Sequence, residues 1–283
     1  MCVTCGCGIA DGATLTVHEA AHEHVHADGT RHTHAQGFAA VPFRQHAHVH
    51  APEIALPIPG RDAHTIQLET QILGKNQLIA ERNRTWLSSK NILALNLVSS
   101  PGAGKTTLLE RTLTDLKLEL KISVIEGDQA TSNDAERIRA TGVPAVQINT
   151  GTGCHLEADM LERALEQLAP APASLLMIEN VGNLVCPALF DLGERAKVVI
   201  FSVTEGEDKP LKYPHMFRAA DVLLLSKTDL LPYIRFDVEG AVANALAVNP
   251  RLTVFRLSAY SGEGLAPWYG WLKRELAASA RMS

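Results

Sequence analysis

The most informative chemical feature is a glycine-rich run that ends in lysine and threonine. It reads Ser99-Ser100-Pro101-Gly102-Ala103-Gly104-Lys105-Thr106-Thr107. The run follows a predicted strand and opens a predicted helix, which is the context of a phosphate-binding P-loop. Its backbone N–H groups would wrap the phosphates, while the Lys105 ammonium adds charge at the β and γ oxygens and the Thr106 hydroxyl ligates Mg²⁺. The alternative is an ordinary glycine turn, but a lysine and a threonine in this context favour a nucleotide site.

Two acidic residues at predicted strand ends are candidate Mg²⁺ ligands. Asp128 ends the second predicted strand and Glu179 ends the fourth, and hard carboxylate oxygens at such tips suit a phosphate-bound Mg²⁺. With Lys105 and Thr106 they form the predicted catalytic set. Either acid could instead cap a helix or face solvent in a turn. Gly182 is a candidate backbone sensor of the γ-phosphate, although a glycine here is equally compatible with a plain turn.

A third group of residues predicts recognition of guanine. Ser226-Lys227-Thr228-Asp229 resembles the N-K-x-D element of GTPases, in which the carboxylate accepts hydrogen bonds from the ring N–H and the exocyclic amine. The aliphatic stem of Lys227 would cover the base. Ser258-Ala259 resembles the last guanine-contacting element. The departures from the GTPase patterns are Ser99, which replaces the first P-loop glycine, and Ser226, which replaces an asparagine.

Soft metal ligands are concentrated at the N-terminus. Cys2, Cys5 and Cys7 place three thiolates within six residues, and sulfur donors favour Ni²⁺, Zn²⁺ or Cu⁺ over Mg²⁺. The alternative is a set of redox-active thiols. Behind them lies a histidine tract that predicts metal buffering or storage, with a solvated spacer as the alternative. The tract contains His18, His22, His24, His26, His32, His34, His46, His48 and His50.

A second metal site is predicted on loops near the P-loop. Cys154-His155 follows the third predicted strand, and Cys186 comes after the Glu179 strand tip. Buried free cysteines are also common as ordinary core residues, but these positions favour a regulated metal site. His64 is assigned no role, and His215 is interpreted as structural.

Composition narrows the class of protein. The net charge is −5 and there is no Lys/Arg-rich cluster, which argues against a nucleic-acid partner. No apolar stretch approaches the roughly 18 residues of a membrane span and no secretory signal is recognisable, so we expect a cytoplasmic protein. Residues 1–64 carry few large apolar side chains and predict a mostly disordered, metal-binding arm. Residues 65–283 predict one P-loop domain.

Within that domain, apolar runs alternate with helical patterns. An amphipathic helix is expected over Gln67–Lys90, followed by the helices Thr106–Leu116, Leu156–Leu168 and Val238–Val248. The expected strands are Ile92–Val98, Ile122–Ile125, Ala145–Ile148, Leu175–Ile178, Val198–Val203, Val222–Leu225 and Leu252–Leu257. This alternation predicts an α/β fold with a doubly wound, mainly parallel sheet, whose ligands gather beyond the carboxyl ends of the strands.

Taken together, the motifs resemble the HypB family of hydrogenase nickel-incorporation GTPases over nearly the whole chain. The resemblance rests on the Cys2–Cys7 cluster, the histidine tract, the P-loop, Gly127-Asp128-Gln129, Gly151–Leu156, Glu179–Pro187 and Ser226–Pro232. It implies a GTP-dependent homodimer that hydrolyses GTP slowly. Working with the zinc-containing accessory protein HypA, this homodimer would deliver nickel to the hydrogenase large subunit.

The resemblance also implies two Ni²⁺ or Zn²⁺ sites. The tight nickel site falls on Cys2, Cys5 and Cys7, and a weaker site at the dimer interface falls on Cys154, His155 and Cys186.

Three other functions remain open from the residues. A urease-type nickel-delivery GTPase would share the P-loop and the histidines, but the Cys2–Cys7 cluster argues against it. A nickel-storage protein would have a vestigial nucleotide site. A small-molecule P-loop kinase would need an acceptor-site motif, and none is apparent.

Overall fold

The computed structural model describes most of the chain after residue 62. Its backbone covers Thr14–His18, Glu23–Val25, Arg31–Thr33, Val41–Pro42, 63–128 and 133–280, and its side chains cover 70–128 and 134–280. The predicted Cys2–Cys7 metal site lies outside the described residues, as does most of the arm that was predicted to be disordered. The same holds for the side chains of the histidine tract.

Seven parallel strands form the centre of the fold, in the order β11-β10-β9-β5-β8-β6-β7. They are β5 (Leu93–Ser99), β6 (Ile122–Asp128), β7 (Ala145–Asn149), β8 (Leu175–Glu179), β9 (Ala196–Ser202), β10 (Val222–Ser226) and β11 (Thr253–Arg256). The predicted mainly parallel sheet is therefore confirmed. Beyond β7 the sheet continues with β1 (Thr14–His18) and β4 (Val41–Pro42), which are antiparallel, while β2 (Glu23–Val25) pairs with β3 (Arg31–Thr33).

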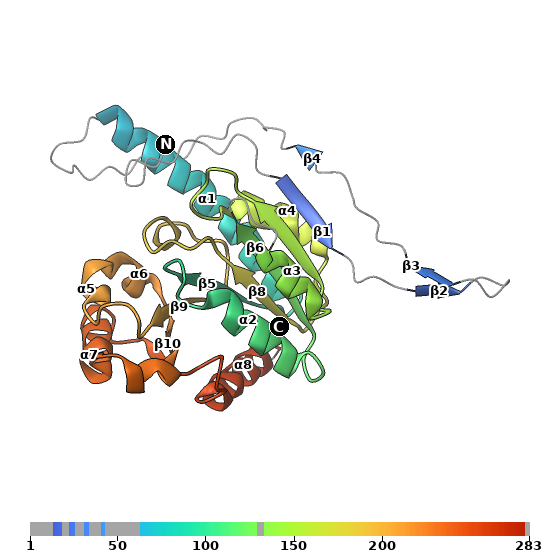
Figure 1. Ribbon diagram of the computed structural model, residues 1–283. Coiled ribbons are helices and arrows are strands. Elements are labelled where there is room, and N and C mark those ends of the chain that lie inside the picture. Colours follow the sequence, from blue (N-terminus) through green and yellow to red (C-terminus); the bar gives the residue numbers. More distant parts are fainter. Residues whose placement is uncertain are drawn as a thin grey trace.

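Helices cover both faces of the sheet (Figure 1). The helices are α1 (Ala63–Ser89), α2 (Lys105–Leu116), α3 (Asn133–Ala140), α4 (Ala158–Leu168), α5 (Lys209–Lys212), α6 (Pro214–Ala219), α7 (Val238–Val248) and α8 (Leu265–Ser279), with 3₁₀ turns η1 (Cys186–Ala188) and η2 (Thr228–Tyr233). One core cluster packs α2, α3 and α8 against the sheet. On the opposite face, α1 and α4 contribute to a second cluster, and α6 and α7 contribute to a third. This doubly wound arrangement brings all carboxyl strand ends to one edge.

The structure differs from the predicted elements in places that have a physical reason. Helix α3 was not predicted because only two residues of this polar segment, Ala135 and Ile138, are buried hydrophobics. The short helices α5 and α6 and the longer α8 were also missed. Helix α4 begins at Ala158 rather than Leu156, since Leu156 packs against the backbone of β6 in the preceding loop. A Cβ atom on Gly127 would lie 2.6 Å from the Leu156 side chain.

Helix α1 is attached to the loops at the carboxyl edge through two buried asparagines. The Asn83 side-chain amide donates to the carbonyls of Ala158 at 2.8 Å and Leu192 at 3.0 Å. Asn76 donates to the Asp191 carbonyl at 2.7 Å and accepts from the Ala158 N–H at 2.8 Å. Because buried amides are costly when unpaired, these bonds fix the start of α4 relative to the segment before β9.

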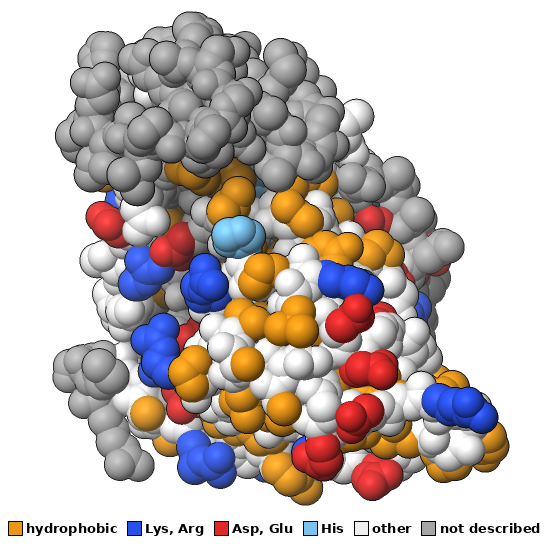
Figure 2. Space-filling model, turned by 90° about the vertical axis from the view of Figure 1, so that its left-hand side faces the viewer, with side chains coloured by type: hydrophobic (Ala, Val, Ile, Leu, Met, Phe, Trp, Pro, Cys, Tyr) orange, Lys and Arg blue, Asp and Glu red, His pale blue; other side chains and the backbone are white. Residues whose placement is uncertain are grey.

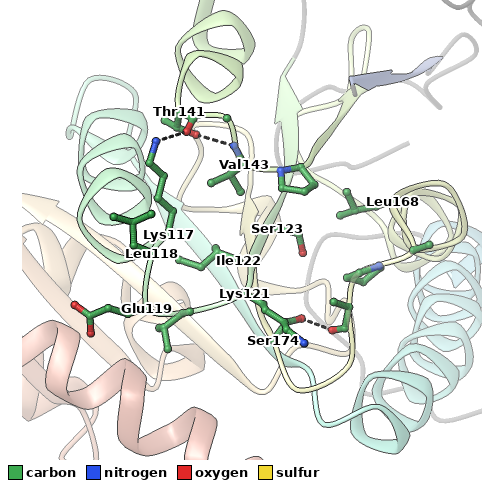
Figure 3. A pocket seen from close by; sticks show the side chains of 16 residues that line it. Lys117, Leu118, Glu119, Lys121, Ile122, Ser123, Thr141, Val143, Leu168 and Ser174 are labelled. Atoms are coloured by element: carbon green, nitrogen blue, oxygen red, sulfur yellow. Dashed lines mark hydrogen bonds between the residues drawn. The ribbon is translucent and has the colours of Figure 1, made fainter. Parts of the chain in front are cut away.

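A hollow of about 660 Å³ lies at the opposite, amino-terminal edge of the sheet (Figure 3). It is lined by the segments that precede β6, β7 and β8, and the Lys117 ammonium crosses it to donate to the Thr141 carbonyl at 2.7 Å. None of its lining residues belongs to the predicted sites. In doubly wound folds ligands bind beyond the carboxyl ends of the strands, so we expect the functional site at the carboxyl-terminal edge of the sheet.

Candidate functional site

The predicted P-loop joins β5 to α2 with the backbone conformation that the motif requires. Gly102 and Gly104 have φ of 73° and 94°, in the left-handed region that favours glycine, and α2 begins at Lys105. Ser99 is the last residue of β5 and is 1% exposed. Its extended conformation needs no glycine, so this departure from the pattern leaves the loop geometry unchanged.

Glu179 is the centre of the charged cluster at the strand tips. Its Oε1 atom lies 2.6 Å from the Lys105 ammonium and accepts a hydrogen bond of 2.6 Å from the Thr106 hydroxyl. The other oxygen, Oε2, is buried and has no hydrogen-bond partner in the structure. A buried carboxylate oxygen without a partner is costly, and a cation would satisfy it. The residues at this point therefore fit Mg²⁺.

The second predicted acid lies on the neighbouring strand. Asp128 ends β6, and the register of β6 with β8 pairs Glu126 with Glu179, so three acidic residues occupy two adjacent strand ends. The Asp128 carbonyl accepts the Thr150 N–H at 2.8 Å, which ties this tip to the loop after β7. The structure therefore places Asp128 at the strand end next to the one that carries Glu179, and its role as a Mg²⁺ ligand stays a prediction.

Glu126 is a part of this cluster that sequence reasoning missed. It is 3% exposed. Burial is the main cause that raises its pKa to about 8, and the nearby carboxylates of Glu179 and Asp128 add to the rise while Lys105 opposes it. The signal in the sequence was a glutamate directly after the apolar run that ends at Ile125, two residues before Asp128. In the nucleotide-free protein, this strand end accordingly carries less negative charge at neutral pH than its carboxyl groups suggest.

Gly182 lies where a phosphate sensor would be needed. A Cβ atom at this position would approach the backbone of Pro101 to 3.3 Å, so the loop after β8 runs directly against the P-loop. A side chain here would force the two segments apart. The structure thus places the predicted sensor at the phosphate-binding loop, and its role in sensing stays a prediction.

The predicted guanine-binding residues also converge on the P-loop. The Ser226 hydroxyl donates to the Ala103 carbonyl at 2.8 Å, and the Lys227 ammonium donates to the Gly102 carbonyl at 2.7 Å. Ser226 thereby supplies a bond between the strand end and the P-loop from the position where the GTPase element has asparagine. This departure leaves the predicted base site connected to the phosphate site.

Ser258 and its neighbours hold the carboxylate of Asp229, which is predicted to bind the base. The Ser258 hydroxyl donates to Asp229 Oδ1 at 2.5 Å and accepts the N–H groups of Tyr260 and Ser261 at 3.2 and 3.0 Å. Arg111 of α2 donates to the Ala259 carbonyl at 3.3 Å. These bonds orient Asp229 beside the P-loop helix, where it is half-buried.

The predicted inner metal ligands meet in a buried cluster. Candidate ligand atoms of Cys154, His155 and Cys186, the inner metal cluster, all lie within 4.8 Å of one another. The residues are 8%, 8% and 0% exposed, and neither of these two cysteines is in a disulfide. The His155 ring packs against Phe190 with centroids 4.0 Å apart, and its Nε2 atom is buried without a hydrogen-bond partner. The Glu157 carboxylate lies 3.6 Å from this nitrogen. Two thiols and an imidazole are donors that would fit Ni²⁺ or Zn²⁺.

The comparisons with known proteins agree with this geometry. The family model "CobW/HypB/UreG, nucleotide-binding domain" matches residues 93–256. Hydrogenase maturation factor HypB of Azotobacter chroococcum mcd 1 is 57% identical over 235 residues, covering 83% of this chain and 75% of that protein. HypB of Escherichia coli K12 is 46% identical over 303 aligned residues, covering 98% and 100%. The chain belongs to the HypB family of hydrogenase maturation factors.

Solved structures of HypB proteins have the same fold. HypB from Archaeoglobus fulgidus is 40% identical with a TM-score of 0.67, covering 71% of this chain and 98% of that one. HypB from Helicobacter pylori in complex with nickel is 39% identical with a TM-score of 0.68, covering 72% and 96%. The resemblance to the HypB family is thus confirmed, and the matched nucleotide-binding domain contains the P-loop, Asp128, Glu179 and Asp229.

In the part of the chain that the structure describes, no helix combines the length and the apolar character that a membrane crossing requires.

Proposed function

We propose that this protein is a GTP-hydrolysing metallochaperone that binds nickel and delivers it to the large subunit of nickel-iron hydrogenase during maturation. The observation that carries the proposal is the contact between its two sites. Leu156, which directly follows His155, packs on Gly127 beside Asp128, and its N–H donates to the Asn180 side chain at 3.1 Å. Any movement of the strand tips on nucleotide binding therefore acts on the metal-bearing loop.

The phosphate end of the site supports GTP hydrolysis with Mg²⁺. Lys105 and Thr106 share one oxygen of Glu179, and triphosphate binding would draw both of them toward the phosphates. Thr106, Asp128 and Glu179 would hold Mg²⁺, and the bound ion would supply charge neutralisation at the phosphate oxygens. Gly102, Ala103, Gly104 and Thr107 complete the cradle. Slow turnover suits this role, because the nucleotide must stay bound while cargo is transferred.

The base end supports the choice of guanine. Asp229 is oriented by Ser258, and a carboxylate accepts hydrogen bonds from the N1–H and 2-amino groups that guanine offers and adenine lacks. Lys227 reaches over the P-loop to the Gly102 carbonyl, which lays its aliphatic stem across the entrance where the base would stack. Ala259 contributes its backbone to the same edge.

The cargo pathway begins at the tight nickel site assigned to Cys2, Cys5 and Cys7 and includes the inner metal cluster for Ni²⁺ or Zn²⁺. We propose HypA and the hydrogenase large subunit as partners, since maturation requires the transfer of nickel between proteins. A reducing cytoplasm suits the soft donors of this pathway, because thiols stay reduced there.

We further propose a homodimer whose interface includes the loop that carries Cys186. Leu189, three residues farther on, leaves 49% of its surface exposed, and Leu211 of α5 leaves 54% exposed. Figure 2 shows the face formed around α5, α6 and α7, where hydrophobic side chains lie among charged ones. Exposed leucines next to a metal loop favour a contact between copies.

Nickel titrations test the coupling that defines the proposal. Full-length protein loaded with GDP is compared with protein loaded with a non-hydrolysable GTP analogue, each with Mg²⁺, and the nickel affinity and the oligomer mass are measured. We expect the inner-site affinity to differ at least fivefold between the two states, because coupling between two sites is reciprocal in free energy. Equal affinities would remove the switch.

The guanine assignment has its own test. Asp229→Asn replaces one acceptor by an amide donor that faces the donors of guanine, so GTP affinity should fall at least tenfold while xanthosine triphosphate gains affinity. Unchanged GTP binding in this variant would contradict the base site.

A further inference from the structure

A row of polar side chains interrupts the apolar face of the sheet. It lies between the core cluster under α1 and α4 and the core cluster under α6 and α7. Asn96 in β5 and Lys197 in β9 are register partners in adjacent parallel strands, so their side chains lie on the same face. Asn96 is fully buried and Lys197 is 6% exposed. A buried ammonium is costly in the middle of a sheet unless it is fully paired, so its partners indicate what it does.

One end of this row is attached to the loop of Cys186. The Lys197 ammonium donates to the carbonyl of Pro187 at 2.7 Å and to that of Phe190 at 3.3 Å. Pro187 follows Cys186 in the chain, and the Phe190 ring is the one that packs against His155. A single buried cation therefore holds both the segment after one metal ligand and the ring that supports another.

The other end is attached to the loop of His155. Glu194 lies 3.7 Å from the Lys197 ammonium, and its Oε1 accepts from the Asn96 amide at 3.0 Å. Asn96 in turn accepts from the Asn180 amide at 3.2 Å, and Asn180 accepts the N–H of Leu156 at 3.1 Å. The polar chain thus ends one residue after His155 and one residue after Cys186.

We propose that Lys197 and Glu194 are positioning residues of the inner metal cluster. Its ligands come from two loops that are separate in sequence, so the metal geometry depends on how far apart those loops are held. A buried, fully paired polar network is stiff and has one arrangement, whereas an apolar core could repack. The inference rests on the proposed function, because it assigns a role in metal binding to residues that contact no metal.

The test uses full-length protein in which Cys2, Cys5 and Cys7 are changed to alanine, so that nickel absorbance from the thiolates reports on the inner cluster. Nickel is titrated in competition with a chelator, and the thiolate-to-nickel charge-transfer band is recorded. Lys197→Met should weaken nickel binding at least tenfold and alter the band, a loss typical of residues that orient metal ligands. Arg82→Met, which removes a cation from a solvent-accessible ion pair between α1 and α4, is the matched control and should bind nickel like the parent.

The outcomes separate the two proposals. If Lys197→Met leaves the nickel affinity and the spectrum unchanged, this inference alone is overturned. If the parent binds no nickel at the inner cluster, the proposed metal function is overturned as well. If Lys197→Met does not fold, Glu194→Gln decides. This near-isosteric change removes the charge of Glu194 and one of its two acceptors, and should weaken nickel binding at least threefold at unchanged GDP affinity. Parent-like nickel affinity in Glu194→Gln would overturn the role.

Discussion

The nucleotide site and the inner metal cluster are built in different ways, although they share the same edge of the sheet. The phosphate-binding residues are contiguous in sequence, and Lys105 and Thr106 need only the strand end that carries Glu179. The candidate metal ligands come from two loops, which we infer are held in place by buried polar residues of β5 and β9 and of the segments after β8 and before β9. A local motif therefore forms the candidate nucleotide site, whereas tertiary structure brings the candidate metal ligands together.

The largest effect should come from Lys105→Ala, because it removes the cation of the phosphate site. We expect GTP and GDP affinities to fall at least 100-fold, about 2.7 kcal/mol, by isothermal titration calorimetry. Lys117→Ala, a lysine at the opposite edge of the sheet, is the control. Nickel binding at Cys2, Cys5 and Cys7 should survive in Lys105→Ala, and its loss would contradict the division into two modules.

Cys186→Ala tests the other side of the comparison. In protein without the N-terminal thiolates, we expect affinity for nickel and zinc to fall at least thirtyfold, about 2 kcal/mol, since one of the two thiolates is lost. Chelator competition measures the effect, with GDP affinity followed in parallel. Binding as tight as in the parent would show that the inner cluster is an ordinary core contact.

The junction between the sites should give the protein an unusual pH dependence. In nucleotide-free protein the pKa of Glu126 is raised to about 8 from an ordinary value of 4.5. Between these values the folded chain binds more protons than the unfolded chain, so stability falls as pH rises. Glu126→Gln removes this contribution. The unfolding free energy of the variant minus that of the parent should therefore increase by up to ~1.4 kcal/mol per pH unit as the pH rises from 5 to 8.

Urea unfolding at several pH values measures that gain, and Glu166→Gln, an exposed glutamate of α4, is the control. Parallel pH profiles for Glu126→Gln and the parent would show that Glu126 titrates normally.

The same contrast explains what the sequence could predict. The seven parallel strands and the phosphate and guanine residues follow from contiguous motifs and apolar runs, since each needs only neighbours along the chain. The polar row was missed because Asn96 and Lys197 are about 100 residues apart and become neighbours only through the register of β5 and β9. Its signal was available, since asparagine and lysine inside near-continuous apolar runs are unusual. Helix α8 also had a signal in the spacing of Leu265, Trp268 and Leu272.

The smallest effect concerns Ser226, where one hydroxyl joins the base site to the P-loop. Ser226→Ala removes a buried hydrogen bond to the Ala103 carbonyl, and a bond of this kind contributes about 1 kcal/mol. GTP affinity should therefore fall about fivefold, with GDP affected equally because the contact lies away from the γ-phosphate. Ser226→Asn distinguishes a serine that links the base site to the P-loop from a serine that weakens the base site. If serine performs the linking role here, asparagine should not raise GTP affinity, whereas a tighter variant would mean that the serine weakens the base site.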